Sequence, residues 1–453
     1  MKKIHSFLAL FLVLALAVPT WALAAEEPMH VEAASAILID ADYDVVLYEQ
    51  DADEQRYPAS ITKVMTGLLT VEAIDRGELG LDNVVTLGED LYLGIGEGGS
   101  TQNLKTGEML TVRDLLACAL IPSANEACNG LAMVVAGDIP TFVERMNQRA
   151  AELGMTGTHF TNTHGYHDDN HYTTARDISR MCLEAMKHPA FREMVSSKSY
   201  LVPETNLHRA RDLSDTNYMI TNRITGAGDG AKLLYSHAIG IKTGSTPEAG
   251  FCLASAAEKN GRTMIAVLLG GQYWKVDGQY YETNYFTESR KLLEYGFNSF
   301  SRKTVLSQID PVATVAVDLC AEQDYVTLQP AQGIEATLPN DVDPAAFERK
   351  VTVAETVDAP VQKGQALGTI TISYDGKDYG TVELVAATTL ERSQRMYIFR
   401  GIGRFFSQLW VKLLGLVLVL VVLVLALRRA IFGPSRRKYR RYGGNYSGRR
   451  GRR

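Results

Sequence analysis

Two side chains in the stretch PASITKVMT, Ser60 and Lys63, could together perform acyl-transfer chemistry. They lie three residues apart at the expected start of a helix, so they share one face of it. A serine is a poor nucleophile until a base takes its proton. A lysine can be that base where burial, positive neighbours and a helix N-terminus lower its pKa. The pattern alone is weak, because the chain repeats it at Ser435 and Lys438 in a basic C-terminal tail.

A second pair, Ser123 and Asn125, lies in the stretch LIPSANEAC, where Pro122 interrupts two helical patterns. A loop at this break could direct a hydroxyl and an amide into a cleft. The alternative is a plain helix cap, a role that serine and asparagine side chains commonly fill. The pair by itself leaves both interpretations open.

The tripeptide Lys-Thr-Gly occurs twice. The first copy, 105–107, lies in a polar loop just before an expected helix start at Thr111, which indicates a turn glycine and a solvated lysine. The second copy, 242–244, ends the predicted strand SHAIGIKTG. A strand edge can bind an extended peptide, and Gly244 leaves room for the close approach of another backbone. The second copy is therefore the candidate for chemistry.

The three motifs are S-x-x-K at 60–63, S-A-N at 123–125 and K-T-G at 242–244, with separations of 63 and then 119 residues. In this order they resemble the motif set of penicillin-binding proteins and serine β-lactamases. Longer stretches, among them LLACALIPSANEAC and GIKTGSTPEAGFCLASA, are similar to low-molecular-weight D-alanyl-D-alanine carboxypeptidases. The likeness covers roughly residues 30–300. The segment PVQKGQALGTI and the hairpin after it resemble that family's C-terminal β-domain, to about residue 390.

The resemblance implies roles for the first four motif residues in the hydrolysis of a peptidoglycan stem peptide. Ser60 would attack the carbonyl between two D-alanines, with Lys63 as its general base. Ser123 would pass a proton toward the leaving D-Ala amine, and Asn125 would orient Lys63 and the substrate amide. Water would then release the acyl chain, and no cofactor is implied.

The same resemblance implies that the second Lys-Thr-Gly binds the substrate. Lys242 would keep the site electropositive, Thr243 would bind the terminal carboxylate, and Gly244 would leave room for the bound chain. The backbone N–H groups of Ser60 and Ser245 would form the oxyanion hole. β-Lactam antibiotics would acylate the same serine and so inhibit the enzyme.

Three alternatives use the same motifs. A class A β-lactamase needs a glutamate that activates a deacylating water, and the sequence has no E-x-x-L-N stretch to carry it. A transpeptidase would form the same acyl-enzyme and transfer it to an amine, and the sequence does not exclude such an activity. A binding or scaffold protein could dispense with motif residues, whereas all of them are intact in this chain.

The elements that must position these residues form an α+β pattern. The stretch SAILIDADYDVVLYEQ predicts a β-hairpin, and residues 58–190 carry mainly amphipathic helical patterns. Strands return from Ser236, the last two joined at Asn260-Gly261, before a closing helix in SRKLLEYGFNSF. An antiparallel sheet built from both ends of the domain, with helices inserted, is the β-lactamase/transpeptidase-like arrangement of the family that the chain resembles.

After about Lys303 apolar and polar residues alternate, which predicts a small all-β domain over residues 303–390. Its final two strands meet at Asp375-Gly376, a sequence typical of a tight hairpin turn. No catalytic grouping is found in this stretch, so we expect a spacer or an interaction module.

Both ends of the chain carry targeting or membrane signals. Residues 1–25 have two lysines, an apolar run and an Ala-Leu-Ala end, which predict a secretory signal peptide; a retained anchor is the alternative. Residues 409–427 are apolar over about the length that spans a bilayer, with a buried core helix as the alternative. The tail at 428–453 has ten arginines, one lysine and no acid. The positive-inside rule therefore places the tail in the cytoplasm and the catalytic domain outside.

Charge and residue usage limit the partners and cofactors. Residues 26–411 hold all 52 acidic residues against 32 basic ones, which argues against nucleic acid as a partner. Five scattered cysteines make no disulfide framework and are expected to be buried apolar residues. Four histidines raise the alternative of zinc, but their segment is structural in the family resembled, so we expect no metal. These are His159, His164, His167 and His171.

Overall fold

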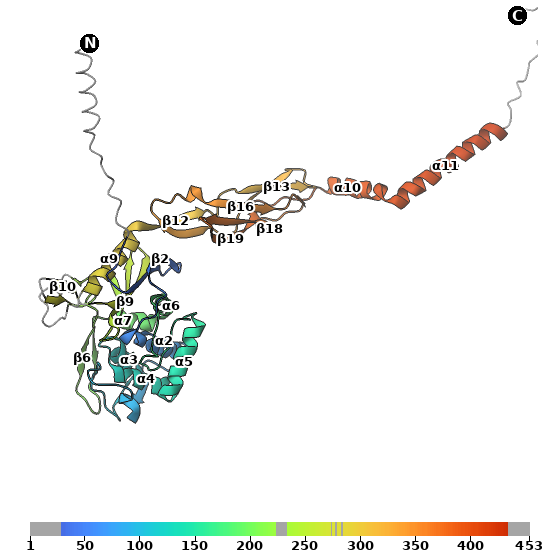
Figure 1. Ribbon diagram of the computed structural model, residues 1–453. Coiled ribbons are helices and arrows are strands. Elements are labelled where there is room, and N and C mark those ends of the chain that lie inside the picture. Colours follow the sequence, from blue (N-terminus) through green and yellow to red (C-terminus); the bar gives the residue numbers. More distant parts are fainter. Residues whose placement is uncertain (1–28, 223–232, 273, 277–278, 282–283, 434–453) are drawn as a thin grey trace, which may run out of the picture. The chain divides into compact units, whose positions relative to one another are not determined.

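The computed structural model describes residues 29–222, 233–272, 274–276, 279–281 and 284–433 (Figure 1). The predicted signal peptide at 1–25 and the part of the basic tail from residue 434 on lie outside the described residues. The chain divides into two compact units. The first runs to Lys303 and includes Ala336–Val342, and the second comprises Thr304–Glu335 and the chain from Asp343 on.

The first unit is built on a five-stranded antiparallel sheet in the order β2-β1-β9-β8-β7. Its strands come from both sequence ends of the unit, which confirms the predicted α+β arrangement. β8 and β9 meet at Asn260 and Gly261, whose φ values of 54° and 71° fit the predicted tight hairpin. The strands are β1 (Ser35–Asp40), β2 (Val45–Gln50), β7 (Ala238–Thr246), β8 (Gly250–Lys259) and β9 (Arg262–Gly271).

Both faces of this sheet are covered, so all six residues of β1 are buried. Side chains alternate between the two faces of a strand. Ile37 and Ile39 of β1 join an apolar cluster with the helices from the middle of the chain. Leu38 joins a second cluster with α9 (Asn284–Ser299), which packs against β8 and β9 (Figure 1).

The helical region between β2 and β7 carries the first two motifs. α2 is buried over most of its surface, as expected of a central helix. The predicted break at Pro122 is confirmed, since α3 ends before it and α4 begins after it. The elements are η1 (Ala59–Thr62), α2 (Lys63–Asp75), η2 (Glu89–Tyr92), α3 (Val112–Leu120), α4 (Asn125–Ala136), α5 (Ile139–Glu152), α6 (Ala175–Ala185) and α7 (Pro189–Ser196).

Several short strands are not predicted by the sequence patterns, because runs of three or four residues show too little alternation. They pair as β3 with β4, β5 with β6 and β10 with β11. These strands are β3 (Val84–Thr86), β4 (Met109–Thr111), β5 (Ser199–Val202), β6 (Arg211–Ser214), β10 (Trp274–Val276) and β11 (Gln279–Tyr281).

The expectation that the second Lys-Thr-Gly ends its strand is wrong. β7 continues past Gly244 to Thr246 because its ladder with β8 goes on, with Lys242 opposite Ala254 and Ser245 opposite Phe251. β7 is nevertheless an edge strand of the sheet, as a peptide-binding edge requires.

The second unit contains a six-stranded sheet in the order β16-β18-β19-β14-β13-β17. Its longest hairpin, β18 with β19, turns at Asp375 and Gly376 with φ values of 49° and 74°, as predicted. β12 and β15 form a separate pair, and each has residues in the first unit as well as in the second. The elements are β12 (Phe300–Leu306), β13 (Ala313–Asp318), β14 (Tyr325–Pro330), β15 (Ile334–Pro339), η3 (Pro344–Ala346), β16 (Glu348–Val353), β17 (Thr356–Asp358), β18 (Ala366–Tyr374) and β19 (Lys377–Ala386).

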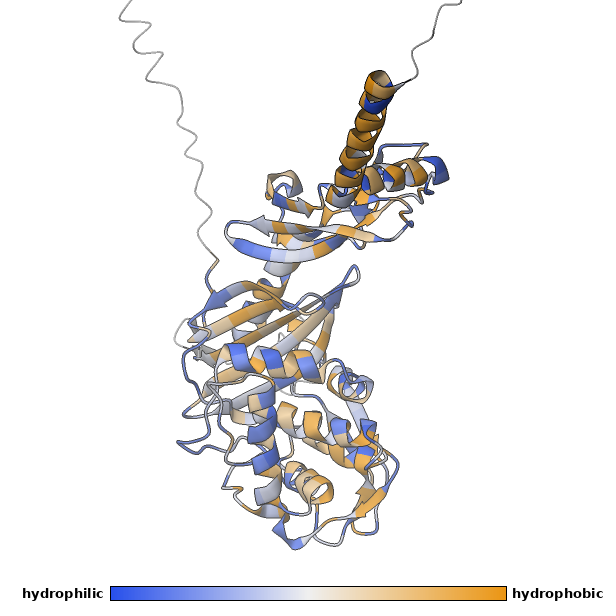
Figure 2. Cartoon of the chain, turned by 90° about the vertical axis from the view of Figure 1, so that its right-hand side faces the viewer, coloured by the Kyte–Doolittle hydropathy of each residue, from blue (hydrophilic) through white to orange (hydrophobic). Residues whose placement is uncertain are grey.

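Two helices end the described chain. α11 (Leu409–Phe432) is the one helix in the described part of the chain that is long and apolar enough to cross a membrane, and Figure 2 shows its apolar character along most of its length. α10 (Gln394–Ser407) precedes it and is not predicted from the sequence. Arg400 of α10 forms ion pairs with Asp318 and Asp358 of the same unit.

Candidate active site

The predicted nucleophile and base are in direct contact. Ser60 lies in η1, and Lys63 is the first residue of α2. The Lys63 Nζ donates hydrogen bonds to the Ser60 Oγ at 2.7 Å and to the backbone oxygen of His164 at 2.8 Å. Lys63 is completely buried (0% exposed), and this burial, reinforced by the charge of Lys242, lowers the pKa of its amine to about 7. An amine with that pKa can be neutral near pH 7 and accept the serine's proton.

The turn that presents Ser60 is held in a conformation that few residues adopt. Ala59 has a φ of 46°, and its backbone oxygen accepts a hydrogen bond from the Thr62 hydroxyl at 2.8 Å. A Cβ on Gly165 would come within 1.8 Å of that same oxygen, so only glycine fits there. The close packing of the segment around Gly165 therefore fixes the position of the nucleophile.

Two buried histidines beside this turn, His164 and His171, are structural. His171 makes hydrogen bonds through one ring nitrogen to the Thr62 hydroxyl (2.8 Å) and through the other to the Thr161 N–H (3.0 Å). His164 is also buried, and its Nδ1 accepts from the Tyr166 N–H at 3.1 Å. Burial lowers the pKa of both imidazoles to about 3, so they stay neutral at ordinary pH.

Ser123 and Asn125 lie between α3 and α4, and they do not cap the helix. The N-cap residue of α4 is Ala124, whose side chain cannot cap, and Ser123 has a φ of 70°. The buried Ser123 hydroxyl has no hydrogen-bond partner among the described residues. Asn125 donates its backbone N–H to the Ser100 oxygen at 2.9 Å, and its side chain faces Gly99. The hydroxyl of Ser123 is thus both buried and unpartnered within the described residues.

The second Lys-Thr-Gly lies directly against Ser60, the predicted nucleophile. A Cβ on Gly244 would come within 3.0 Å of the Ser60 backbone nitrogen, so the absence of a side chain lets β7 touch η1. Lys242 is 1% exposed, and burial lowers its pKa to about 8, a shift that the neighbouring carboxylate of Asp215 opposes. The predicted close approach at Gly244 is therefore present.

A cavity of about 320 Å³ opens above these groups. Ser60, Asn125 and Ser245 line it directly, whereas Lys63 and Lys242 are buried behind its wall. The remaining wall comes from three loops: Glu97–Ser100, Gly165–His167 and Thr246–Glu248. The three motifs, 182 residues apart from Ser60 to Lys242, thus meet at one cleft.

Three groups that contact the motif residues were not predicted from the sequence. The His164 oxygen that binds Lys63 belongs to the backbone, which leaves no signal in residue types. Asp215, 7% exposed, is a buried carboxyl beside Lys242, and burial raises its pKa to about 7. The Thr216 hydroxyl lies 2.5 Å from the Thr243 hydroxyl. The cluster of short polar residues in SDTN reads as an ordinary turn, so nothing in it points to the cleft.

The first Lys-Thr-Gly lies in a turn before β4, as predicted. Lys105 and Thr106 are exposed, and Gly107 has a φ of 79° with open space around it. The Lys105 N–H donates to the Glu108 carboxylate at 3.0 Å, so the turn uses the backbone of this lysine and leaves its amine in solvent.

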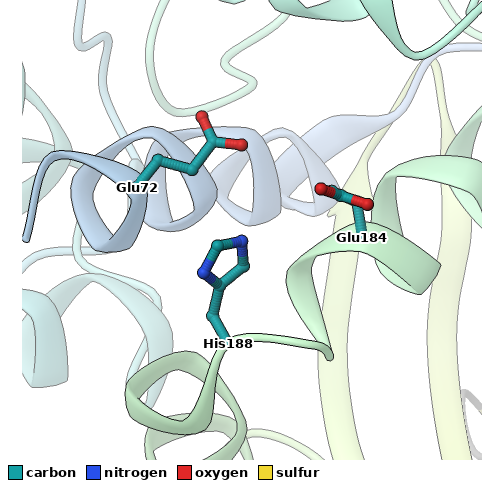
Figure 3. Close-up of side chains that lie close together, drawn as sticks. All are labelled: Glu72, Glu184 and His188. Atoms are coloured by element: carbon teal, nitrogen blue, oxygen red, sulfur yellow. The ribbon is translucent and has the colours of Figure 1, made fainter. Parts of the chain in front are cut away.

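One group of side chains could hold a metal by geometry within the described ranges of the chain: Glu72, Glu184 and His188 (Figure 3). Their ligand atoms lie within 4.8 Å of one another. The guanidinium of Arg149 already binds Glu72 at 2.8 Å and Glu184 at 3.1 Å. The two carboxylates have their counter-charge, so the group is an ion-pair network that joins α2, α5 and α6.

All five cysteines are free and buried, as expected. Cys128 lies on α4, near Lys63 and Lys242. Burial raises the pKa of this thiol to about 12, so it remains protonated and takes no part as a nucleophile.

Two family models match the sequence. One, described as D-alanyl-D-alanine carboxypeptidase, matches residues 22–273, and one described as Penicillin-binding protein 5, C-terminal domain, matches residues 300–392. The D-alanyl-D-alanine carboxypeptidase DacF of Bacillus subtilis (strain 168) is 31% identical over 349 residues, covering 76% of this chain and 82% of that protein. The D-alanyl-D-alanine carboxypeptidase DacC of Escherichia coli (strain K12) is 30% identical over 401 residues, covering 86% of this chain and 90% of that protein.

A solved structure of penicillin binding protein 5 from Haemophilus influenzae has the same fold, with a TM-score of 0.62 at 24% identity, covering 81% of this chain and 99% of that one. The first family model spans more than half of the chain. The expected α+β fold with a C-terminal all-β domain is confirmed. On these matches the chain belongs to the D-alanyl-D-alanine carboxypeptidase family of serine peptidases, peptidase S11.

Proposed function

We propose that this protein is a serine D-alanyl-D-alanine carboxypeptidase that removes the terminal D-Ala from peptidoglycan pentapeptide stems. The observation that carries the proposal is the contact of 2.7 Å between the Lys63 Nζ and the Ser60 Oγ, made by a fully buried amine with a lowered pKa. A nucleophile, a base and an adjoining edge strand at one cleft suit acyl transfer on an extended peptide.

Acylation begins when neutral Lys63 takes the proton of Ser60. The Ser60 Oγ bonds to the carbonyl carbon between the two D-alanines, and the negative charge moves to the carbonyl oxygen. Ser60 and Ser245 both line the cavity, and their backbone N–H groups stabilise this oxyanion. The carbon–nitrogen bond then breaks, and D-Ala leaves as an amine after it receives a proton through the unpartnered Ser123 hydroxyl.

The substrate chain lies along the edge of β7. Edge strands have free backbone groups that pair with an extended peptide. The terminal carboxylate binds the Thr243 hydroxyl, in the electropositive field of Lys242, and Asn125, which lines the cavity, binds the substrate amide. Gly244 brings this strand against Ser60 and so sets the distance between bound carbonyl and nucleophile.

Water completes the cycle by hydrolysing the Ser60 ester, which regenerates the hydroxyl and releases the shortened stem peptide. β-Lactam antibiotics acylate the same serine. The chain lacks the E-x-x-L-N glutamate that would activate water in a class A β-lactamase, so the penicilloyl-enzyme persists and the antibiotic inhibits. The residues named here carry every step, so the mechanism requires no cofactor.

We also propose that α11 crosses the cell membrane once, with the catalytic unit on the extracytoplasmic side. The basic tail supports this orientation, and α10 presents exposed apolar side chains, such as those of Phe399 and Phe406, immediately before the span. The proposed organisation is a signal peptide at 1–25, a catalytic domain at 30–300, a β-domain at 303–390, a membrane helix at 409–427 and a cytoplasmic tail at 428–453.

The test of this function is the release of D-Ala from a pentapeptide that ends in D-Ala-D-Ala, by the full-length protein in detergent. The wild-type protein should release one D-Ala per peptide, and Ser60→Ala should release none. Lys105→Ala, which changes an exposed lysine away from the cleft, is the matched control and should retain activity. A wild-type protein that binds penicillin but releases no D-Ala would contradict the proposal.

A further inference from the structure

The hydroxyl of Thr243 has a protein partner that no sequence motif includes. Thr216 lies between β6 and β7 in the chain, 27 residues before Thr243, and its Oγ1 is 2.5 Å from the Thr243 Oγ1. No other hydrogen bond of the Thr216 side chain is found within the described residues. The contact joins two hydroxyls, and either of them could be the donor.

The segment that contains Thr216 is hydrogen-bonded to β7, the strand that contains Thr243. Asn217, 1% exposed, donates its side-chain amide to the Gly240 oxygen of β7 at 3.1 Å. Its own N–H donates to the Asp215 carboxylate at 2.5 Å, and its side-chain oxygen accepts from the Met219 N–H at 3.0 Å. Because buried residues on both sides of Thr216 are held in this way, the distance between the two hydroxyls is set by the fold.

The direction of this hydrogen bond decides what Thr243 can offer a ligand. A hydroxyl has one proton and two lone pairs. If Thr243 donated to Thr216, a carboxylate would meet only lone pairs and be repelled. If Thr216 donates to Thr243, the Thr243 proton points to the carboxylate, and a chain of hydroxyl donors that ends on an anion is strengthened at each step.

We propose that Thr216 is a positioning residue that directs the Thr243 proton toward the C-terminal carboxylate of the substrate, and so contributes to selectivity for peptides that end in a free carboxylate. The proposal rests on the proposed function, in which Thr243 binds that carboxylate. Thr216 itself acts only through Thr243.

The test uses Thr216→Val, which keeps the shape of the side chain and removes the hydroxyl, in the full-length protein. Two peptides are compared, one ending in D-Ala-D-Ala and the same peptide with its terminal carboxylate converted to a carboxamide. For the carboxylate peptide, Thr216→Val should raise KM about tenfold with kcat within about twofold of wild type, because the contact is made in both ground and transition states. For the carboxamide peptide kcat/KM should not change.

Thr216→Ser, which keeps the hydroxyl, should restore KM for the carboxylate peptide to within about twofold of wild type. Thr216→Ala serves as a second deletion of the hydroxyl should the valine fit poorly. Equal losses on both peptides, a fall in kcat at unchanged KM, or no loss on the carboxylate peptide would each overturn the proposal.

Thr243→Val separates this proposal from the function on which it rests. It should abolish the preference for the carboxylate peptide and leave Thr216→Val with no further effect in the double variant. A wild-type protein that releases no D-Ala would refute the proposed function itself, and the inference about Thr216 would fall with it. A wild-type protein that is active while Thr216→Val is unchanged on the carboxylate peptide would refute only the inference.

Discussion

The two Lys-Thr-Gly tripeptides of this chain have identical residues and opposite surroundings. Lys105 is exposed in a turn, and Gly107 has open space around it. Lys242 is 1% exposed in an edge strand, and Gly244 has the Ser60 backbone within 3.0 Å of where a Cβ would be. The first copy stabilises a loop, whereas the second places a buried lysine and an edge strand beside Ser60.

The difference lies in which atoms each copy uses. In the first, the Lys105 and Gly107 N–H groups bind Glu108 and Leu87, and the Thr106 hydroxyl donates to the Gly88 oxygen at 3.1 Å. The amine does nothing in this turn, so another residue could replace the lysine. In the second copy the amine is desolvated and the threonine hydroxyl reaches Thr216. The different properties of the two copies therefore come from the burial of the lysine amine and from the neighbours of the threonine hydroxyl. The tripeptide sequence alone does not determine them.

The largest effect on acylation should come from Lys242→Ala, measured in parallel with Lys105→Ala as its matched control. Lys242→Ala should slow acylation by benzylpenicillin about a thousandfold, because the site loses the charge that stabilises the carboxylate and the developing oxyanion. Lys105→Ala should be acylated at a rate within about twofold of that of the wild type. Both rates can be measured with a fluorescent penicillin under single-turnover conditions.

Acylation of Lys242→Ala at the wild-type rate would show that the second copy is not the binding strand. A large loss in Lys105→Ala would show that the turn before β4 contributes to the cleft.

A smaller effect should follow from adding a methyl group to each glycine. Gly244→Ala forces β7 away from Ser60, and a displacement of this kind should lower the acylation rate about a hundredfold. Gly107→Ala meets no neighbour, but its φ of 79° is unfavourable for alanine. It should lower the free energy of unfolding by about 1 kcal/mol and leave acylation unchanged.

Thermal unfolding and penicillin acylation of the two glycine variants test this pair. If Gly244→Ala were destabilised but acylated normally, the close contact with Ser60 would be structural only.

The smallest effect is on the pH dependence of the acylation rate. Lys63 must be neutral to accept the Ser60 proton, and burial with the charge of Lys242 lowers its pKa to about 7. The acylation rate should therefore fall as pH drops through 7, by about tenfold for each unit below it. The carboxylate of Glu126 opposes the shift, since its negative charge favours the charged amine.

Glu126→Gln removes this opposing charge. It should lower the pKa of Lys63 further and move the acid limb of the pH–rate profile to lower pH by less than one unit. Lys105→Gln should leave the limb where it is in wild type. A limb that moves to higher pH in Glu126→Gln would contradict the assignment of Lys63 as the base.

The sequence predicts the parts of this site that depend on residue type and order. Ser60, Lys63, Asn125 and Ser245 are found at or behind one cleft because the three motifs occur in the family's order. Alternation and turn residues likewise predict the hairpin at Asn260 and the helix break before Ser123.

The rest depends on contacts that residue types do not encode. The backbone oxygen of His164 binds Lys63 from 101 residues away, and any residue could supply it. Asp215 and Thr216 reach the second Lys-Thr-Gly only because their segment is fastened to Gly240 of β7. Positive φ values at Ala59 and Ser123 arise from tertiary packing, since neither residue favours them.

The most direct test of Ser60 as the nucleophile is to locate the covalent adduct. The full-length protein is incubated with benzylpenicillin, quenched, digested and analysed by mass spectrometry. We expect one penicilloyl group, on the peptide that contains Ser60, present in wild type and Lys105→Ala, strongly delayed in Lys242→Ala and absent from Ser60→Ala. An adduct on any other residue, or none on the wild-type protein, would contradict the assignment of Ser60 as the nucleophile.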